Sequence, residues 1–102
     1  MFALIVYIPE KNLEEVKNAM LAAGAGRIGN YDSCCWQTKG IGQFRPLEGA
    51  NPAIGSVGEI ERLEEWKVEM VVESAKIEAV VVAMKKAHPY ETVAYYYTEV
   101  RT

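Results

Sequence analysis

The sequence predicts a single α+β domain over residues 1–102, with strands and helices in the order β-α-β-β-α-β. Three observations indicate this class: strand-like apolar patterns near both ends of the chain, two helical apolar stripes, and one long stretch in which apolar and charged residues alternate. In this order two helices cover one face of a four-stranded antiparallel sheet, which is the ferredoxin-like arrangement.

The first strand is predicted over residues 1–8, where apolar side chains occur at both parities. Such a strand is covered on both faces and therefore lies inside the sheet. Pro9 ends it, and a helix is predicted over residues 13–23, where apolar residues recur at helical spacing. Asn12 is expected to cap this helix, and Gly24 follows its end.

A second strand is predicted over residues 28–39, after a glycine turn at residues 24–27. The next segment, residues 40–58, contains five glycines and two prolines. This composition predicts a long loop with at most a short strand at residues 43–45. Loops of that length often carry function.

The third strand is predicted over residues 60–73, and its alternation gives it one buried and one charged face. Ser74 is expected to cap the second helix. That helix ends before Pro89 and brings His88 near the negative end of the helix dipole. A last, tyrosine-rich strand is predicted over residues 93–100. The third strand's buried face is formed by Trp66, Val68, Met70 and Val72, and the helix stripe by Ile77, Val80, Val81 and Met84.

Composition excludes several classes of partner. The 11 basic residues are scattered among 14 acidic ones, so no nucleic-acid surface is expected. No apolar run approaches the roughly 20 residues of a membrane span, and the first residues lack a basic signal-peptide region, which predicts a cytoplasmic protein without membrane contact. The adjacent Cys34 and Cys35 are expected to be free thiols. The acidic residues between positions 59 and 73 are interpreted as a solvated strand edge.

The segment from His88 to Glu91 holds the only histidine. His88 and Glu91 offer nitrogen and oxygen ligands to a divalent metal ion, the candidate cofactor, and a thiolate from Cys34 or Cys35 is the third candidate ligand. The alternative, which the position favours, is that His88 bonds the last carbonyls of its helix or interacts with the dipole.

Other residue patterns give candidate ligand contacts but no catalytic residue. Gly40 and Gly42 resemble part of a phosphate-binding loop, although the lysine and the helix N-terminus of such a loop are missing. No Ser/His/Asp arrangement is recognisable around the single histidine, and the cysteines lack CxxC spacing. We therefore expect no enzyme, and the ligand-binding candidates are Tyr90, Arg45, Phe44, Gly40 and Gly42.

Three motifs together are specific: GIGQFRP at residues 40–46, EGANPAIG at residues 48–55 and AHPYE at residues 87–91. Their order resembles the domain inserted into many bacterial members of the Nif-three-like family of dinuclear-metal hexameric proteins. The resemblance extends from Val6 to Val100. It implies a fold similar to the trimeric CutA divalent-ion tolerance proteins and PII nitrogen regulators.

The resemblance also implies limits. The dinuclear metal centre of that family is built from flanking domains that this chain does not have, so its metal site and any hydrolase or cyclohydrolase activity are not carried over to the insert standing alone. CutA and PII relatives imply a ligand or metal site between subunits. Arg45 is the only basic group in the predicted loop, which weakens an analogy with PII nucleotide binding.

Two functions are expected from these observations. The first is a small oligomeric regulatory or sensing module that binds a small ligand or divalent ion at a subunit cleft near His88, Tyr90 and Glu91. The second is a protein-interaction module that docks through the loop, with Phe44 and Leu47 exposed, or through the acidic strand. Because the helices cover only one face of the sheet, we expect copies of the chain, favouring a trimer, to cover the other.

Overall fold

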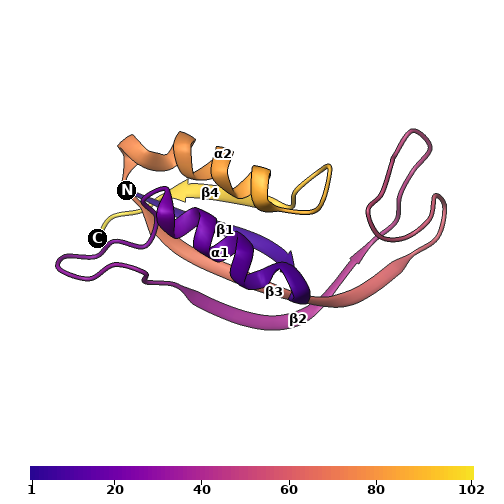
Figure 1. Ribbon diagram of the computed structural model, residues 1–102, viewed down its shortest axis with the longest axis horizontal. Helices are drawn as coiled ribbons and strands as arrows, with labels where there is room; N and C mark the ends of the chain where they lie inside the picture. The colour runs from indigo at the N-terminus through magenta and orange to yellow at the C-terminus, as the bar shows by residue number, and fades with distance from the viewer.

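The computed structural model describes all residues from Met1 to Thr102, and it confirms the predicted element order and fold class (Figure 1). One antiparallel sheet has the strand order β2-β3-β1-β4, and both helices lie on one of its faces. Neither helix is long and apolar enough to cross a membrane. The elements are β1 (Phe2–Pro9), α1 (Leu13–Ala22), β2 (Trp36–Phe44), β3 (Glu61–Val72), α2 (Ile77–Ala87) and β4 (Tyr95–Glu99).

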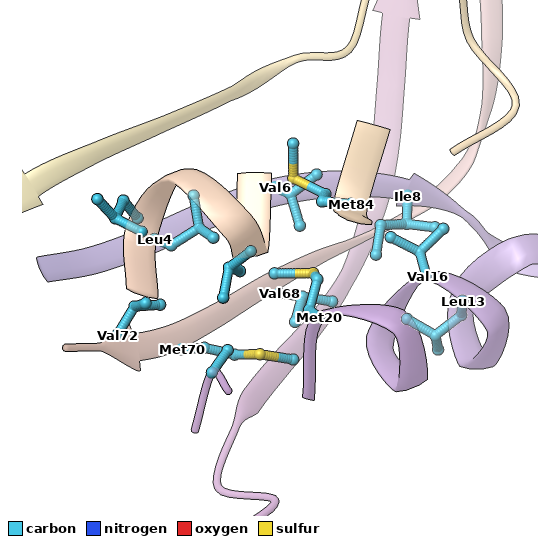
Figure 2. Close-up of a cluster of buried hydrophobic side chains, with 13 residues drawn as sticks. Leu4, Val6, Ile8, Leu13, Val16, Met20, Val68, Met70, Val72 and Met84 are labelled. Carbon is cyan, nitrogen blue, oxygen red and sulfur yellow. The ribbon is translucent and has the colours of Figure 1, made fainter. Parts of the chain in front are cut away.

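The hydrophobic core lies between the two helices and the sheet (Figure 2). Alternate residues of β1 point into it, and Leu4, Val6 and Ile8 are fully buried. Met20 of α1 and Met84 of α2 are also fully buried, so both helices contribute to the same cluster. Burial of each such side chain stabilises the fold by about 1.5–3 kcal/mol.

The other face of the sheet carries no helix. Ile5 on this face is 7% exposed because it lies between β3 and β4, where it pairs with Glu69 and Tyr96. Tyr96 is 52% exposed and Trp36, on β2, is 69% exposed. This face therefore presents aromatic surface to solvent.

Strands β2 and β3 continue past the helices as a long hairpin arm (Figure 1). The molecule measures 47 Å along its long axis and only 24 and 23 Å across. Lys39 forms ion pairs with Glu10 at 2.9 Å and with Glu64 at 3.3 Å, and its ammonium lies 5.8 Å from the centre of the Trp66 ring. These contacts join the arm to the turn that follows β1.

The two chain ends lie side by side, at the opposite end of the molecule from the tip of the arm (Figure 1). The backbone N–H of Val100 donates to the carbonyl of Met1 at 3.0 Å. The terminal ammonium of Met1 donates to Ser74 Oγ at 2.8 Å. These two hydrogen bonds join the start of β1 to the end of β4 and to the short turn that precedes α2.

The predicted second strand was displaced along the sequence. Residues 28–35 form a loop in which Gly29 and Ser33 have φ values of 58° and 60°, a left-handed backbone conformation that interrupts a regular strand. The strand begins at Trp36 and continues through Gly40 and Gly42 to Phe44, where a loop was predicted. The glycines fit a strand because this segment pairs with β3 along its whole length.

Asn12 is the N-cap residue of α1, as predicted, but its side chain makes no capping hydrogen bond. The prediction for Ser74 was wrong, because Lys76 is the N-cap residue of α2. A short 3-10 turn precedes each helix, Glu10–Asn12 before α1 and Ser74–Lys76 before α2. The Oδ1 atom of Asn12 is buried without a partner. The acidic segment is not an edge either, because β3 lies between β1 and β2.

Candidate functional site

His88 follows the last residue of α2 and has its ring buried, with 6% of the residue exposed. Its Nε2 lies 2.8 Å from the carbonyl oxygen of Tyr7 in β1, and its Nδ1 accepts from the backbone N–H of Tyr90 at 3.2 Å. These partners assign the proton to Nε2. Burial lowers the pKa of His88, against the opposing effect of the Tyr7 carbonyl, and this favours the neutral ring.

This arrangement corrects the expectation for His88. The ring does not bond the last carbonyls of its own helix; it joins α2 to β1. Lys85 and Lys86 supply the positive charge in the last turn of α2 instead. Because both ring nitrogens already have partners, His88 acts here as a buried connection between elements.

Tyr90 lies against three side chains. Its phenol donates to Glu65 Oε2 at 3.3 Å, and its ring centre is 5.8 Å from that of Phe44 and 5.0 Å from that of His88. Burial raises the pKa of Tyr90, and the charge of Glu65 adds to this effect. Burial also raises the pKa of Glu65, whereas the hydrogen bond from Tyr90 lowers it.

Glu91 connects two loops that lie far apart in the sequence. Its Oε1 accepts from the backbone N–H of Asn51 at 2.9 Å. Asn51 belongs to the β2–β3 loop (residues 45–60), and Glu91 to the α2–β4 loop (residues 88–94). The β2–β3 loop is itself closed by a hydrogen bond from the N–H of Gly58 to the carbonyl of Pro46 at 2.8 Å.

A cavity of about 510 Å³ lies between these two loops, and we call it the loop cavity. Four residues that the sequence indicated as candidate ligand or metal contacts line it: Phe44, Arg45, Tyr90 and Glu91. Its other walls are mainly apolar and come from Leu47, Ala50, Pro52, Ala53, Ile54 and Ala94. A largely apolar cavity with a few polar groups is typical of small-molecule sites.

A second hollow of about 470 Å³ lies beside it, and we call it the sheet hollow. Gly40 and Gly42 line the sheet hollow, together with Tyr7, Lys67 and Glu65. A side chain at position 42 would collide with the carboxylate of Glu65, whereas one at position 40 would meet open space. Gln43, Glu65 and Ala94 line both spaces, so the sheet hollow adjoins the loop cavity.

The three candidate metal ligands are not gathered into one cluster. No group of three His, Cys, Asp or Glu side chains is placed to hold a metal ion. Cys35 is exposed in the loop before β2, and Cys34 and Cys35 both carry free thiols. His88 and Glu91 are three positions apart in one loop but contact different partners, Tyr7 and Asn51.

The sequence reasoning missed Glu65. The residue was assigned to the charged, solvated face of its strand, yet it is half-buried where the loop cavity meets the sheet hollow. The sequence feature that indicates this position is the pair of glycines in β2. Gly40 pairs with Glu65, and because glycine has no side chain, no neighbouring side chain at that position of β2 covers Glu65.

No protein-family model matches the chain. The chain is 49% identical over 92 residues to a GTP cyclohydrolase 1 type 2 homologue of Bacillus subtilis, covering 90% of this chain and 25% of that protein. A homologue of the same description from Mycobacterium tuberculosis is 47% identical over 91 residues, which cover 89% of this chain and 24% of that protein. The chain thus spans about a quarter of the length of these relatives.

Solved structures agree with this relationship. A Bacillus cereus protein related to NIF3 superposes with a TM-score of 0.85 at 38% identity, over 99% of this chain and 26% of that chain. The periplasmic divalent cation tolerance protein CutA from Archaeoglobus fulgidus superposes with a TM-score of 0.70 at 18% identity, over 100% of this chain and 86% of that chain. The predicted resemblance is confirmed: this chain has a CutA-like fold, and it is related to a segment that makes up about a quarter of the length of NIF3-related proteins and GTP cyclohydrolase 1 type 2 homologues.

Proposed function

We propose that the chain is a small regulatory or sensing module, without catalytic activity of its own, that binds a small organic ligand in the loop cavity. One observation carries this proposal: two loops, joined by a contact between residues 40 positions apart, flank a half-open cavity of about 510 Å³ lined by Phe44, Arg45, Tyr90 and Glu91. The volume lies within the range of about 300–1,000 Å³ that small-molecule sites occupy. An organic ligand is favoured over a divalent ion because no cluster of metal-ligating side chains lines the cavity.

The contact between Asn51 and Glu91 supplies a way for ligand binding to be sensed. It holds the β2–β3 loop against the α2–β4 loop, and the loop cavity lies between them. A ligand that binds more tightly to one arrangement of the two loops shifts the population toward that arrangement. The β2–β3 loop is then the element that changes in response to the ligand.

The proposal is tested by NMR titration with a panel of small organic compounds. We expect shifts confined to the backbone amides of residues 43–54, of Glu65 and of residues 90–94. Tyr90→Leu removes one wall of the loop cavity and should weaken binding by about ten-fold or more. The matched control is Tyr31→Leu, at a tyrosine that is 76% exposed in the loop before β2. Shifts elsewhere, or equal weakening in both variants, would count against the proposal.

We also propose that copies of the chain cover the open face of the sheet, with a trimer favoured. The exposed Tyr96 and Trp36, beside Ile5 and Tyr7, support this because aromatic surface of that kind is typical of interfaces. Sedimentation of the wild type should give a mass above that of the monomer. This mass should decrease in Tyr96→Glu and stay the same in Tyr31→Glu. A wild-type protein that is monomeric at all concentrations would rule out the proposed oligomer.

Docking onto a different protein through the β2–β3 loop is the second candidate function. Leu47 is 63% exposed and remains available to a partner. Phe44, the other expected contact, packs against Tyr90 instead. The loop therefore offers less apolar surface than the sequence indicated, and ligand binding is the better supported function.

A further inference from the structure

We propose that the carboxylate of Glu65 is the anchor for a positively charged nitrogen, so that the loop cavity takes a small organic amine with an aromatic or apolar body. This inference rests on the proposed function, because it concerns the ligand of the same cavity. It adds a binding residue, Glu65, and a chemical class for the ligand.

The two oxygens of this carboxylate have different surroundings. Oε2 accepts a hydrogen bond from the Tyr90 phenol at 3.3 Å. Oε1 lies against Gly42, at the place where any larger residue would put its Cβ, and it has no hydrogen-bond donor. One oxygen is therefore held in position while the other remains free to accept a hydrogen bond from a ligand.

Glu65 has no cationic partner in the protein. The ion pairs of the molecule join Lys17, Lys39 and Lys67 to other carboxylates, and none reaches Glu65 within 4.0 Å. Arg45 lines the same cavity but lies beyond that distance. A half-buried carboxylate with one neutral donor is poorly compensated for lost water, and a bound ammonium group would compensate it.

The remaining walls suit the body of such a ligand. The rings of Phe44 and Tyr90 meet edge to face, with centres 5.8 Å apart and planes at 60°. Leu47 and Ile54 extend the apolar lining. Aromatic rings attract a cation as well as an apolar group, so a nitrogen placed at Glu65 is favoured by Tyr90 too.

The test uses three compounds that share a phenyl body and differ in charge: 2-phenylethylamine, 2-phenylethanol and 3-phenylpropionate. Each is titrated into the full chain near neutral pH and followed by NMR. We expect the amine to bind about ten-fold more tightly than the alcohol, the effect of one charge-assisted hydrogen bond. The carboxylate compound should bind most weakly of the three.

Two test variants and one control variant show whether this preference depends on Glu65. Glu65→Gln keeps the side-chain shape and should remove the difference in affinity between 2-phenylethylamine and 2-phenylethanol. Glu73→Gln, at an exposed glutamate, is the charge-matched control and should behave like the wild type. Gly42→Ala keeps the charge but displaces the carboxylate, and it should weaken amine binding even if Glu65→Gln does not fold.

The outcomes separate this inference from the proposed function. If all three compounds bind equally in the loop cavity, or if the preference survives in Glu65→Gln or Gly42→Ala, the assignment of Glu65 is wrong and the ligand cavity stands. If none of the three compounds shifts residues of the cavity while another class of compound does, the amine class is wrong. If no compound of any class binds there, both proposals fall.

Discussion

At the scale of single residues, His88 joins three parts of the fold. It ends α2, its ring bonds the carbonyl of Tyr7 in β1, and it receives the backbone N–H of Tyr90. Tyr90 in turn bonds Glu65 of β3. A continuous set of hydrogen bonds therefore runs from β1 to the wall of the loop cavity, and the neutral ring of His88 is its centre.

The stability of the protein should decrease as the pH falls below about 6.5, the ordinary value for the histidine pKa. Burial lowers the pKa of His88 in the folded state, so below about 6.5 the unfolded chain binds the proton more readily than the folded one. The stabilising contribution is complete above that pH and is lost as the pH falls through the folded pKa. Urea unfolding from about pH 7.5 to about pH 5.5 measures it.

His88→Gln is the control for this pH dependence, since its amide can still donate to the Tyr7 carbonyl but does not titrate. Glu65 acts in the opposite direction, because burial raises its pKa above 4.5 and its contribution is lost as the pH rises through the folded value. That titration is common to both proteins and cancels in their difference. An equal slope in His88→Gln and wild type would contradict the role given to His88.

The sequence made His88, Tyr90, Phe44 and Arg45 recognisable as candidates but not their partners. The hydrogen bond from His88 to Tyr7 spans 81 positions, so no local pattern contains it. Glu65 was missed for the same reason. Its alternation with apolar neighbours indicates a solvated face, and only the pairing with glycines in β2 reveals that the side chain lies in a hollow.

At the scale of elements, β2 shows how glycine in a strand shapes a site. Gly40 and Gly42 were interpreted as loop residues because glycine weakens strands. Here the missing side chains leave room on the open face of the sheet, and Glu65 of β3 occupies part of that room. The composition was informative, while the secondary structure inferred from it was wrong.

Alanine at the two glycines should separate these effects. In Gly40→Ala the new methyl meets open space, and we expect no loss of stability. In Gly42→Ala the methyl displaces Glu65 from Tyr90, so the free energy of unfolding should be lower than in Gly40→Ala by about 1 kcal/mol, the worth of one hydrogen bond. Urea unfolding compares them, and equal stabilities would show that the Tyr90 to Glu65 contact contributes little.

The helix α2 offers a second matched pair. Val80 is fully buried and Val82, two positions on, is 66% exposed. Val80→Ala should lower the free energy of unfolding by about 1–3 kcal/mol, because it removes buried methyl groups and leaves a cavity. Val82→Ala should change it by less than about 0.5 kcal/mol. Chemical denaturation of both variants measures the difference. Similar losses of unfolding free energy would mean that the outer face of α2 is covered in solution.

At the scale of the whole molecule, a two-layer body carries a hairpin arm with a loop at its tip (Figure 1). The element order and both helix positions followed from periodicity, since the apolar stripes that define the core are local patterns. The length of the arm could not be predicted from periodicity, because it depends on pairing between β2 and β3 beyond the helices. The loop cavity was likewise beyond local reasoning, as it forms between loops some 40 positions apart.

Replacing residues 47–57 by Asn-Gly should preserve the fold and remove the loop cavity. None of these residues belongs to the core cluster, and a shorter loop costs less entropy to close. We expect a cooperative unfolding transition close to that of the wild type, together with loss of the 2-phenylethylamine shifts. A transition that becomes broad, or a protein that no longer folds, would show that the loop supports the body.

Because Met1 and Val100 lie side by side, the order of the strands and helices along the chain can be permuted. A short linker across these ends would make a continuous backbone, and the chain could be reopened within residues 47–57 as a circular permutant. New ends at that point would lie beside the loop cavity, so a fluorophore attached there would report directly on changes in the β2–β3 loop.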